Sequence, residues 1–380
     1  MRVVVVTGTA RSLVSFRGHL IRAMVDAGHQ VLALSSDDNP GIRDEIHQLG
    51  AEWRPIPILQ GSANPGADVR LFRALRAELS ESSADVVVGF TVKAAIWGAA
   101  AAASLGLRSF AVITGLGHLF LDKTAIGRFR LALSWPLLKF ALSRCDRVFV
   151  QNPDDGDELV RLRLAAPNDI LELAGSGVEL SLYPRSALPA GPVSFLFVGR
   201  LIREKGIAEL FDAVRILRSE GLKPSVVVAG AADRNDGTFA ADLQQQAEIL
   251  GIEMLGRVPD VRPIMAAAHV LVLPSYREGT PRSCLEAMCV GRPLIVTDVP
   301  GCRNVVREGV NGTLVAARDA RALADSLKEF MQVPLERLAD MGNASRQLVE
   351  ERFDVNFVTR DLMEGMQLSG APGFGGGSFP

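Results

Sequence analysis

Residues 270–297 contain two short apolar segments separated by a helical segment, and this pattern constrains the fold more than any other feature. The apolar segments, 270–274 and 293–297, have the composition of strands that are buried on both faces. Thr280 is a good helix N-cap, and Pro281 suits the first helical position, where its missing N–H group is not needed. We therefore predict a strand–helix–strand unit with two parallel strands.

Two carboxylates belong to this unit: Glu278 in the loop after the first strand and Glu286 inside the predicted helix. In α/β sheets, ligands bind at the carboxyl ends of the strands, and the N–H groups at a helix start attract phosphate. Carboxylates at that place suit the hydroxyl groups of a ribose or a sugar on either side of a phosphate. From spacing alone, a solvated loop glutamate and a surface helix glutamate explain the two residues equally well.

The same alternation of apolar strands and amphipathic helices runs through the rest of the 380 residues. A chain of this length is too long for one ordinary hydrophobic core. Residues 185–192 contain two prolines and a glycine, and the strand pattern restarts after them. We expect a first α/β domain, 1–184; a linker, 185–192; a second α/β domain, 193–352; a last helix, 353–368; and a disordered tail, 369–380.

Charge and cysteine content exclude several classes of function. The chain has 41 basic and 43 acidic residues, which does not indicate a nucleic-acid-binding protein. Its four cysteines form no CxxC pair, so we expect reduced thiols in a cytoplasmic protein. No apolar run of about 20 residues is long enough to span a membrane. Asp155 and Asp157 lie at a predicted helix start, where they compensate the helix dipole, so we expect no metal site.

Two glycine-containing loops follow predicted strands in the first half. Residues 8–18 suit a dinucleotide-binding turn in part, but no second glycine follows Gly8 at the required spacing. Residues 115–120 follow the strand 109–114, at the place where ligand loops lie in α/β folds. His118 in this loop is a candidate catalytic residue, although a lone histidine is more often structural.

Residues 123–147 form an apolar region in which basic residues outnumber acidic ones. A basic amphipathic surface suits an anionic membrane face or a lipid diphosphate. A core helix pair with a solvated rim explains the pattern equally well. We therefore keep peripheral membrane contact and a structural role as alternatives for this region.

Residues 199–206 form a glycine-bounded turn after the predicted strand 194–198. Arg200 and Lys205 in this turn suit a diphosphate, because arginine makes bidentate contacts and lysine supplies a point charge. Two surface charges are the simpler alternative. The turn and the Glu278 loop are both expected to open on the same crevice.

Several motifs together resemble the retaining glycosyltransferases of family 4, which have the GT-B architecture of two Rossmann-like domains facing each other across a cleft. In the second half these motifs are 199–206, 255–258 and 278–293. In the first half they are 16–17, 115–117, 151–155 and 175–178, so that the resemblance covers nearly the whole chain.

The resemblance implies a role for each matching residue. Gly199, Arg200 and Lys205 would bind the donor diphosphate, and Glu286 would bind the ribose. The remaining assignments are Arg257 and Val258 beside a uracil base; Glu278 at the donor sugar; Gly279, Thr280 and Pro281 near the phosphate, where Pro281 has no N–H group to donate; His118 facing the donor sugar; and Ser15, Arg17, Gly115 and Gly117 on the acceptor side.

The resemblance also implies the reaction. A UDP-sugar, often a UDP-N-acetylhexosamine, would be the donor, and an undecaprenyl-diphosphate-linked glycan at the cytoplasmic face of the membrane the acceptor. No metal or other cofactor and no enzymic nucleophile are expected, and the last helix would cross back to the first domain. An NAD-linked oxidoreductase, a nucleotide-sugar epimerase and a non-catalytic GT-B subunit that binds lipid-linked glycan are the alternatives.

Overall fold

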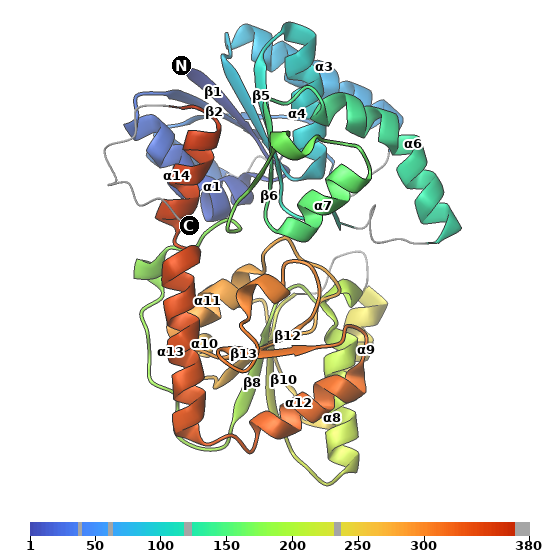
Figure 1. Cartoon of the computed structure of the whole chain (residues 1–380), viewed down its shortest axis with the longest axis vertical. Coiled ribbons are helices and arrows are strands. Elements are labelled where there is room, and N and C mark those ends of the chain that lie inside the picture. Colours follow the sequence, from blue (N-terminus) through green and yellow to red (C-terminus); the bar gives the residue numbers. More distant parts are fainter. Residues whose placement is uncertain (37–39, 60–63, 118–123, 232–236, 369–380) are drawn as a thin grey trace. The chain divides into compact units, whose positions relative to one another are not determined.

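The computed structural model describes residues 1–36, 40–59, 64–117, 124–231 and 237–368 and divides into two α/β units (Figure 1). The first unit comprises Met1–Ser176 together with the C-terminal residues from Val355 onward. The second unit is the continuous segment Gly177–Asp354. The chain therefore leaves the first unit once and returns to it once.

The sheet of the first unit is parallel throughout, with the strand order β3-β2-β1-β4-β5-β6-β7. Its strands are β1 (Arg2–Val6), β2 (Gln30–Ser35), β3 (Glu52–Pro55), β4 (Val86–Phe90), β5 (Arg108–Ile113), β6 (Arg147–Val150) and β7 (Ile170–Glu172). Val3 to Val6 of β1 are fully buried, as the β-branched composition predicts for a central parallel strand. The strand order reverses between β1 and β4, which is the usual place for a ligand crevice.

Helices cover both faces of this sheet. They are α1 (Ala10–Asp26), α2 (Pro40–Gln48), α3 (Pro65–Glu81), α4 (Val92–Leu105), α6 (Ala125–Leu142), α7 (Pro153–Arg161) and α14 (Val355–Gly365). The last helix, α14, packs beside α1, where Leu362, Met363 and Met366 join the same core cluster as Leu20 and Ile21 (Figure 1).

The second unit repeats the arrangement with the strand order β10-β9-β8-β11-β12-β13, again fully parallel. Its strands are β8 (Ser194–Val198), β9 (Ser225–Ala229), β10 (Glu253–Gly256), β11 (Val270–Leu273), β12 (Leu294–Thr297) and β13 (Gly312–Val315). Its helices are α8 (Ile207–Ser219), α9 (Gly237–Leu250), α10 (Arg262–Ala266), α11 (Arg282–Val290), α12 (Ala320–Phe330) and α13 (Leu335–Arg352). The predicted α/β class with two Rossmann-like sheets is confirmed.

The segment after β1 differs from the prediction. Residues 8–18 were expected to form a loop, but α1 begins at Ala10. Leu13, Arg17 and Leu20 are buried on one face of this helix. The helical pattern was missed because a buried arginine takes the place of an apolar residue in it.

Residues 185–192 also differ from the prediction, because they lie inside the second unit rather than between two domains. Arg292, which is 1% exposed, donates hydrogen bonds to Ser186 O at 2.9 Å and to Ala187 O at 3.0 Å. The same guanidinium donates to Met265 O and Ala266 O. The proline- and glycine-rich composition therefore marks an irregular segment that is held in place by a buried arginine.

Candidate functional site

Two loops meet at the carboxyl edge of the second sheet, where the parallel strands β8 and β11 end side by side. The backbone N–H of Tyr276, in the loop after β11, donates to Glu204 O at 2.8 Å, in the loop after β8. Gly206 has a positive φ of 67°, and a Cβ there would lie 1.9 Å from Pro274 O. Only glycine therefore permits this close approach of the two loops.

Lys205 and Glu278 are brought together by these loops. Lys205 Nζ lies 2.5 Å from Glu278 Oε1, and Ser275 Oγ donates to the same oxygen at 2.7 Å. The two charged side chains are 19% and 14% exposed. The residue predicted to bind the diphosphate and the residue predicted to contact the donor sugar thus form one ion pair at the edge of the sheet.

Arg200 and Arg257 lie at the ends of β8 and β10 on the same edge. Gly199 N donates to Ala229 O at 3.0 Å and Gly230 N donates to Gly256 O at 2.8 Å, which keeps the ends of β8, β9 and β10 in register. Both arginines are exposed, whereas Val258 is half-buried. In the part of the chain that the structure describes, neither guanidinium forms an ion pair, so both are available to a ligand at this edge.

Helix α11 begins at Arg282, one residue later than predicted, and Pro281 occupies the cap position. Thr280 therefore precedes the cap, and the first N–H groups of the helix come from Arg282, Ser283 and Cys284. The Cys284 N–H is already bonded to Pro281 O at 3.0 Å. Gly279 and Thr280 lie in the loop between Glu278 and this helix start, and the N–H groups at a helix start favour an anion.

Glu286 lies inside α11 as predicted and is 12% exposed. Tyr183 Oη donates to Glu286 Oε1 at 2.8 Å, and Arg282 Nε donates to the same oxygen at 3.0 Å. Sequence reasoning missed both partners. The spacing of four residues between Arg282 and Glu286 was a readable signal for one of them, but nothing in the sequence indicates the contact of Tyr183.

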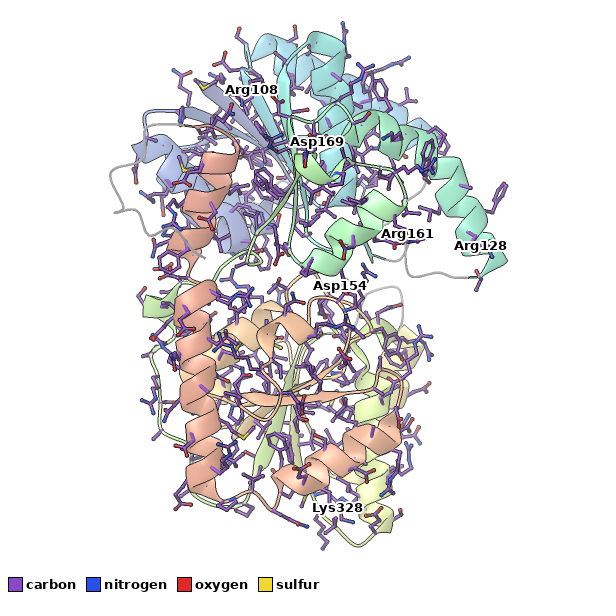
Figure 2. All side chains as sticks on the ribbon, in the orientation of Figure 1. Arg108, Arg128, Asp154, Arg161, Asp169 and Lys328 are labelled. Carbon is purple, nitrogen blue, oxygen red and sulfur yellow. The ribbon has the colours of Figure 1, made fainter. Side chains whose placement is uncertain are left out.

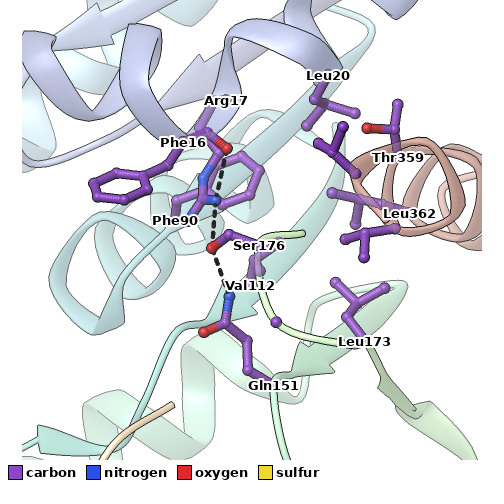
Figure 3. A pocket seen from close by; sticks show the side chains of 13 residues that line it. Phe16, Arg17, Leu20, Phe90, Val112, Gln151, Leu173, Ser176, Thr359 and Leu362 are labelled. Carbon is purple, nitrogen blue, oxygen red and sulfur yellow. Dashed lines mark hydrogen bonds between the residues drawn. The ribbon is translucent and has the colours of Figure 1, made fainter. Parts of the chain in front are cut away.

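The residues predicted to lie on the acceptor side, Ser15, Arg17, Gly115 and Gly117, do not form one cluster in the first unit. Arg17 is buried and donates to Ser176 Oγ at 3.0 Å, while its guanidinium stacks over the Phe90 ring (Figure 3). Gln151 Nε2 donates to the same Ser176 hydroxyl at 3.1 Å. Ser15 is exposed on another face of α1.

A small pocket surrounds this Arg17–Ser176 contact. Its other side is apolar and is formed by Leu20 and Leu173 together with Val358 and Leu362 of α14 (Figure 3). Gly115 and Gly117 have positive φ angles of 122° and 62° after β5. His118, the proposed catalytic histidine, lies outside the described residues.

Helix α6 exposes aromatic residues over most of its length. Phe129, Trp135 and Phe140 are at least partly exposed, and Phe129 is 69% exposed. Arg128 is exposed near the start of the helix (Figure 2), and the Arg144 guanidinium lies 5.0 Å from the centre of the Phe140 ring. Leu138, Ala141 and Leu142 face the core instead. Among the described helices, none is both long and apolar enough to cross a membrane.

The first turn of α7 is acidic, and the Asp155 carboxylate accepts a hydrogen bond from the capping residue. Asn152 caps α7 by accepting from the Asp155 N–H at 2.8 Å, and Asn152 Nδ2 donates to Asp155 Oδ2 at 3.2 Å. Across the described ranges there is no cluster of three or more His, Cys, Asp or Glu side chains that would hold a metal ion. All four cysteines are buried, and burial raises the pKa of Cys145 to about 12.

Comparison with known proteins identifies the families that the two halves of the chain match. Residues 14–174 match the family described as glycosyl transferase 4-like domain, and residues 183–348 match glycosyl transferases group 1. A relative from Campylobacter jejuni, N,N'-diacetylbacillosaminyl-diphospho-undecaprenol alpha-1,3-N-acetylgalactosaminyltransferase, is 23% identical and matches 96% of this chain and 98% of its own length. The Escherichia coli protein WcaL, a putative colanic acid biosynthesis glycosyltransferase, is 30% identical over 54% of this chain and 53% of its own length.

Solved structures share the fold. Anabaena HepE in complex with UDP and glucose superposes with a TM-score of 0.78 at 17% identity, over 97% of this chain and 99% of its own. Sucrose-phosphate synthase from Thermosynechococcus elongatus also gives a TM-score of 0.78 at 17% identity, over 96% of this chain and 98% of its own. These matches confirm the GT-B class of fold predicted from the motifs. The chain belongs to the group 1 glycosyl transferases, with a glycosyl transferase 4-like domain as its first half.

Proposed function

We propose that this glycosyltransferase is a retaining enzyme that moves a sugar, an N-acetylhexosamine, from a UDP-sugar to an undecaprenyl-diphosphate-linked glycan in polysaccharide or glycan biosynthesis. The observation that carries the proposal is the ion pair of Lys205 and Glu278 at the carboxyl edge of the second sheet. The acceptor in the name of the Campylobacter relative and the UDP bound in the HepE complex support the choice of acceptor and donor.

The donor site follows from charge and position. Arg200 and Lys205 bind the diphosphate and stabilise the negative charge that grows on the departing UDP. Glu286 accepts hydrogen bonds from the ribose, and Arg257 and Val258 lie beside the base. Glu278 contacts the donor sugar. The Gly279 and Thr280 loop brings the phosphate to the start of α11, where the helix dipole favours negative charge.

Retention follows from front-face attack in this proposal. The departing phosphate oxygen accepts the proton of the acceptor hydroxyl, the new glycosidic bond forms on the same face, and the sugar–phosphate bond breaks. No enzymic nucleophile takes part in these steps, because the acceptor hydroxyl attacks the sugar directly. No metal ion takes part, because Arg200 and Lys205 supply the positive charge.

Product analysis tests the proposed reaction. A matrix of UDP-sugars and polyprenyl-diphosphate-linked acceptors is incubated with the enzyme in the presence of EDTA, and the products are identified by mass spectrometry and by the anomeric NMR signals. We expect transfer from one UDP-N-acetylhexosamine with the anomeric configuration retained. Inversion, or transfer that is lost when EDTA is added, would contradict the mechanism. UDP binding without any transfer would favour the non-catalytic alternative, and NAD(H) binding the oxidoreductase or epimerase alternative.

The exposed face of α6 supports the membrane part of the proposal. We expect Phe129→Ser to weaken binding to vesicles that contain anionic lipid by about 10- to 150-fold, because burying one phenylalanine contributes about 1.5–3 kcal/mol. Co-sedimentation with vesicles measures the effect. Ile249→Ser, which removes an exposed apolar side chain from α9 in the second unit, is the matched control and should bind as the wild type does. Equal binding of both variants would exclude Phe129 of α6 as a membrane contact.

A further inference from the structure

Within the described residues, one oxygen of the Glu286 carboxylate accepts hydrogen bonds and the other does not. Its Oε1 accepts hydrogen bonds from Tyr183 Oη and from Arg282 Nε, at 2.8 and 3.0 Å. Within the described residues, no hydrogen bond reaches Oε2. A carboxylate oxygen has about two lone pairs, so these two donors fill Oε1 and leave Oε2 for a ligand.

Tyr183 is itself held against the helix that carries Glu286. Arg346 Nη1, from α13, donates to Tyr183 O at 2.9 Å and to Cys289 O of α11 at 2.7 Å. One guanidinium nitrogen thus ties the backbone of Tyr183 to α11, one turn beyond Glu286. The phenol therefore reaches Glu286 from a fixed backbone position rather than from a free loop.

The phenol remains a donor at physiological pH. Burial and the neighbouring Glu286 carboxylate both raise the pKa of Tyr183, so the hydroxyl stays protonated. The protonated hydroxyl donates its hydrogen bond to Glu286 Oε1. The hydrogen bond therefore restrains the rotation of the carboxylate about its last side-chain torsion.

We propose that Tyr183 and Arg282 are positioning residues for Glu286: they hold Oε1 and thereby turn Oε2 toward the ribose hydroxyls of the donor. This inference rests on the proposed function, which assigns Glu286 to the ribose. Ordering a flexible side chain opposes binding, so a carboxylate that is ordered in advance binds the ribose hydroxyls more tightly. The role concerns donor selectivity and requires no contact between Tyr183 and the donor.

Two nucleotides measure this role directly: UDP and 2′,3′-dideoxyuridine diphosphate, which lacks both ribose hydroxyls. The ratio of their dissociation constants, from isothermal titration calorimetry, reports the ribose contact and cancels any general loss of affinity. We expect Tyr183→Phe to lower the preference for UDP by about three- to tenfold, the effect of one hydrogen bond. Arg282→Met should lower it in the same direction, which keeps the test available if the tyrosine variant does not fold.

Tyr276→Phe is the matched control. Tyr276 Oη donates to the Glu209 carboxylate at 2.5 Å in the same unit, so this variant also loses a phenol–carboxylate hydrogen bond, but not one to Glu286. Its preference for UDP should equal that of the wild type. A lowered preference in Tyr276→Phe equal to that in Tyr183→Phe would overturn the specific role of Tyr183.

Glu286→Ala separates this inference from the proposed function. If Glu286→Ala keeps the wild-type preference for UDP, the ribose assignment itself fails. If Glu286→Ala removes the preference while Tyr183→Phe and Arg282→Met retain it, the ribose assignment stands and the positioning role is overturned. Adding Tyr183→Phe to Glu286→Ala should change nothing further, because the two residues act through one contact.

Discussion

Lys205→Ala is expected to lower the rate of sugar transfer about 100- to 1,000-fold, which is the usual loss when one preorganised donor to a developing negative charge is removed. Lys205 lies 2.5 Å from Glu278, so the variant has two defects. It loses the ammonium group that we propose to neutralise the departing UDP, and it leaves the Glu278 carboxylate without its ion pair. UDP release at saturating donor and acceptor measures the change in kcat.

Lys328→Ala is the matched control for this prediction. Lys328, labelled in Figure 2, also pairs with a glutamate of the second unit, Glu220, at 2.7 Å. It lies in the last turn of α12, which starts after β13 at the carboxyl edge and therefore ends at the opposite edge of the sheet. Its removal should leave kcat unchanged. Similar rates for Lys205→Ala and the wild type would remove the proposed donor site.

Arg292→Met should destabilise the second unit by about 3–5 kcal/mol, because it breaks a buried hydrogen-bond network. Burial lowers the pKa of Arg292 to about 10, so the charge itself is disfavoured where it lies. The loss comes instead from the carbonyl groups that its guanidinium satisfies, on Ser186, Ala187, Met265 and Ala266, since an unpaired buried acceptor costs about 1–3 kcal/mol. Methionine has a similar length but no donor.

The distribution of aromatic residues allows the two units to be followed separately. The three tryptophans, Trp53, Trp97 and Trp135, all belong to the first unit. In urea unfolding, Arg292→Met should shift the transition seen by circular dichroism while the tryptophan fluorescence transition stays in place. Arg321→Met, which removes an exposed arginine from α12, should change the stability by less than about 0.5 kcal/mol. Equal stability of Arg292→Met and the wild type would show that residues 185–192 do not depend on Arg292.

The parts of the site that lie at strand ends could be predicted from sequence. Arg200, Lys205 and Glu278 each follow an apolar strand, and parallel strands end at one edge of a sheet, so topology alone brings these residues together. Strand order was not needed for this prediction, because every loop at the carboxyl edge faces the same side. The β-branched and apolar composition of the strands was sufficient.

Contacts between a buried polar side chain and a distant backbone could not be predicted. Arg17 occupies a core position of α1, and a periodicity based on apolar residues therefore began too late in the helix. Arg292 holds residues 185–192 through hydrogen bonds to carbonyl groups, which every residue has and which leave no pattern in the sequence. Tyr183 and Glu286 are 103 residues apart, and only tertiary packing joins them.

Because the chain returns to its first unit after the second, the ribosome makes the last part of the first unit after the whole second unit. The core between α1 and the first sheet includes Leu362, Met363 and Met366, which leave the ribosome after the whole second unit. Domains usually fold as units from the N-terminus during synthesis, but here the N-terminal unit is the later of the two to be completed. Until α14 has been synthesised, the part of α1 that α14 covers lacks its partner, and a chain truncated before Val355 would carry a complete second unit and an incomplete first unit.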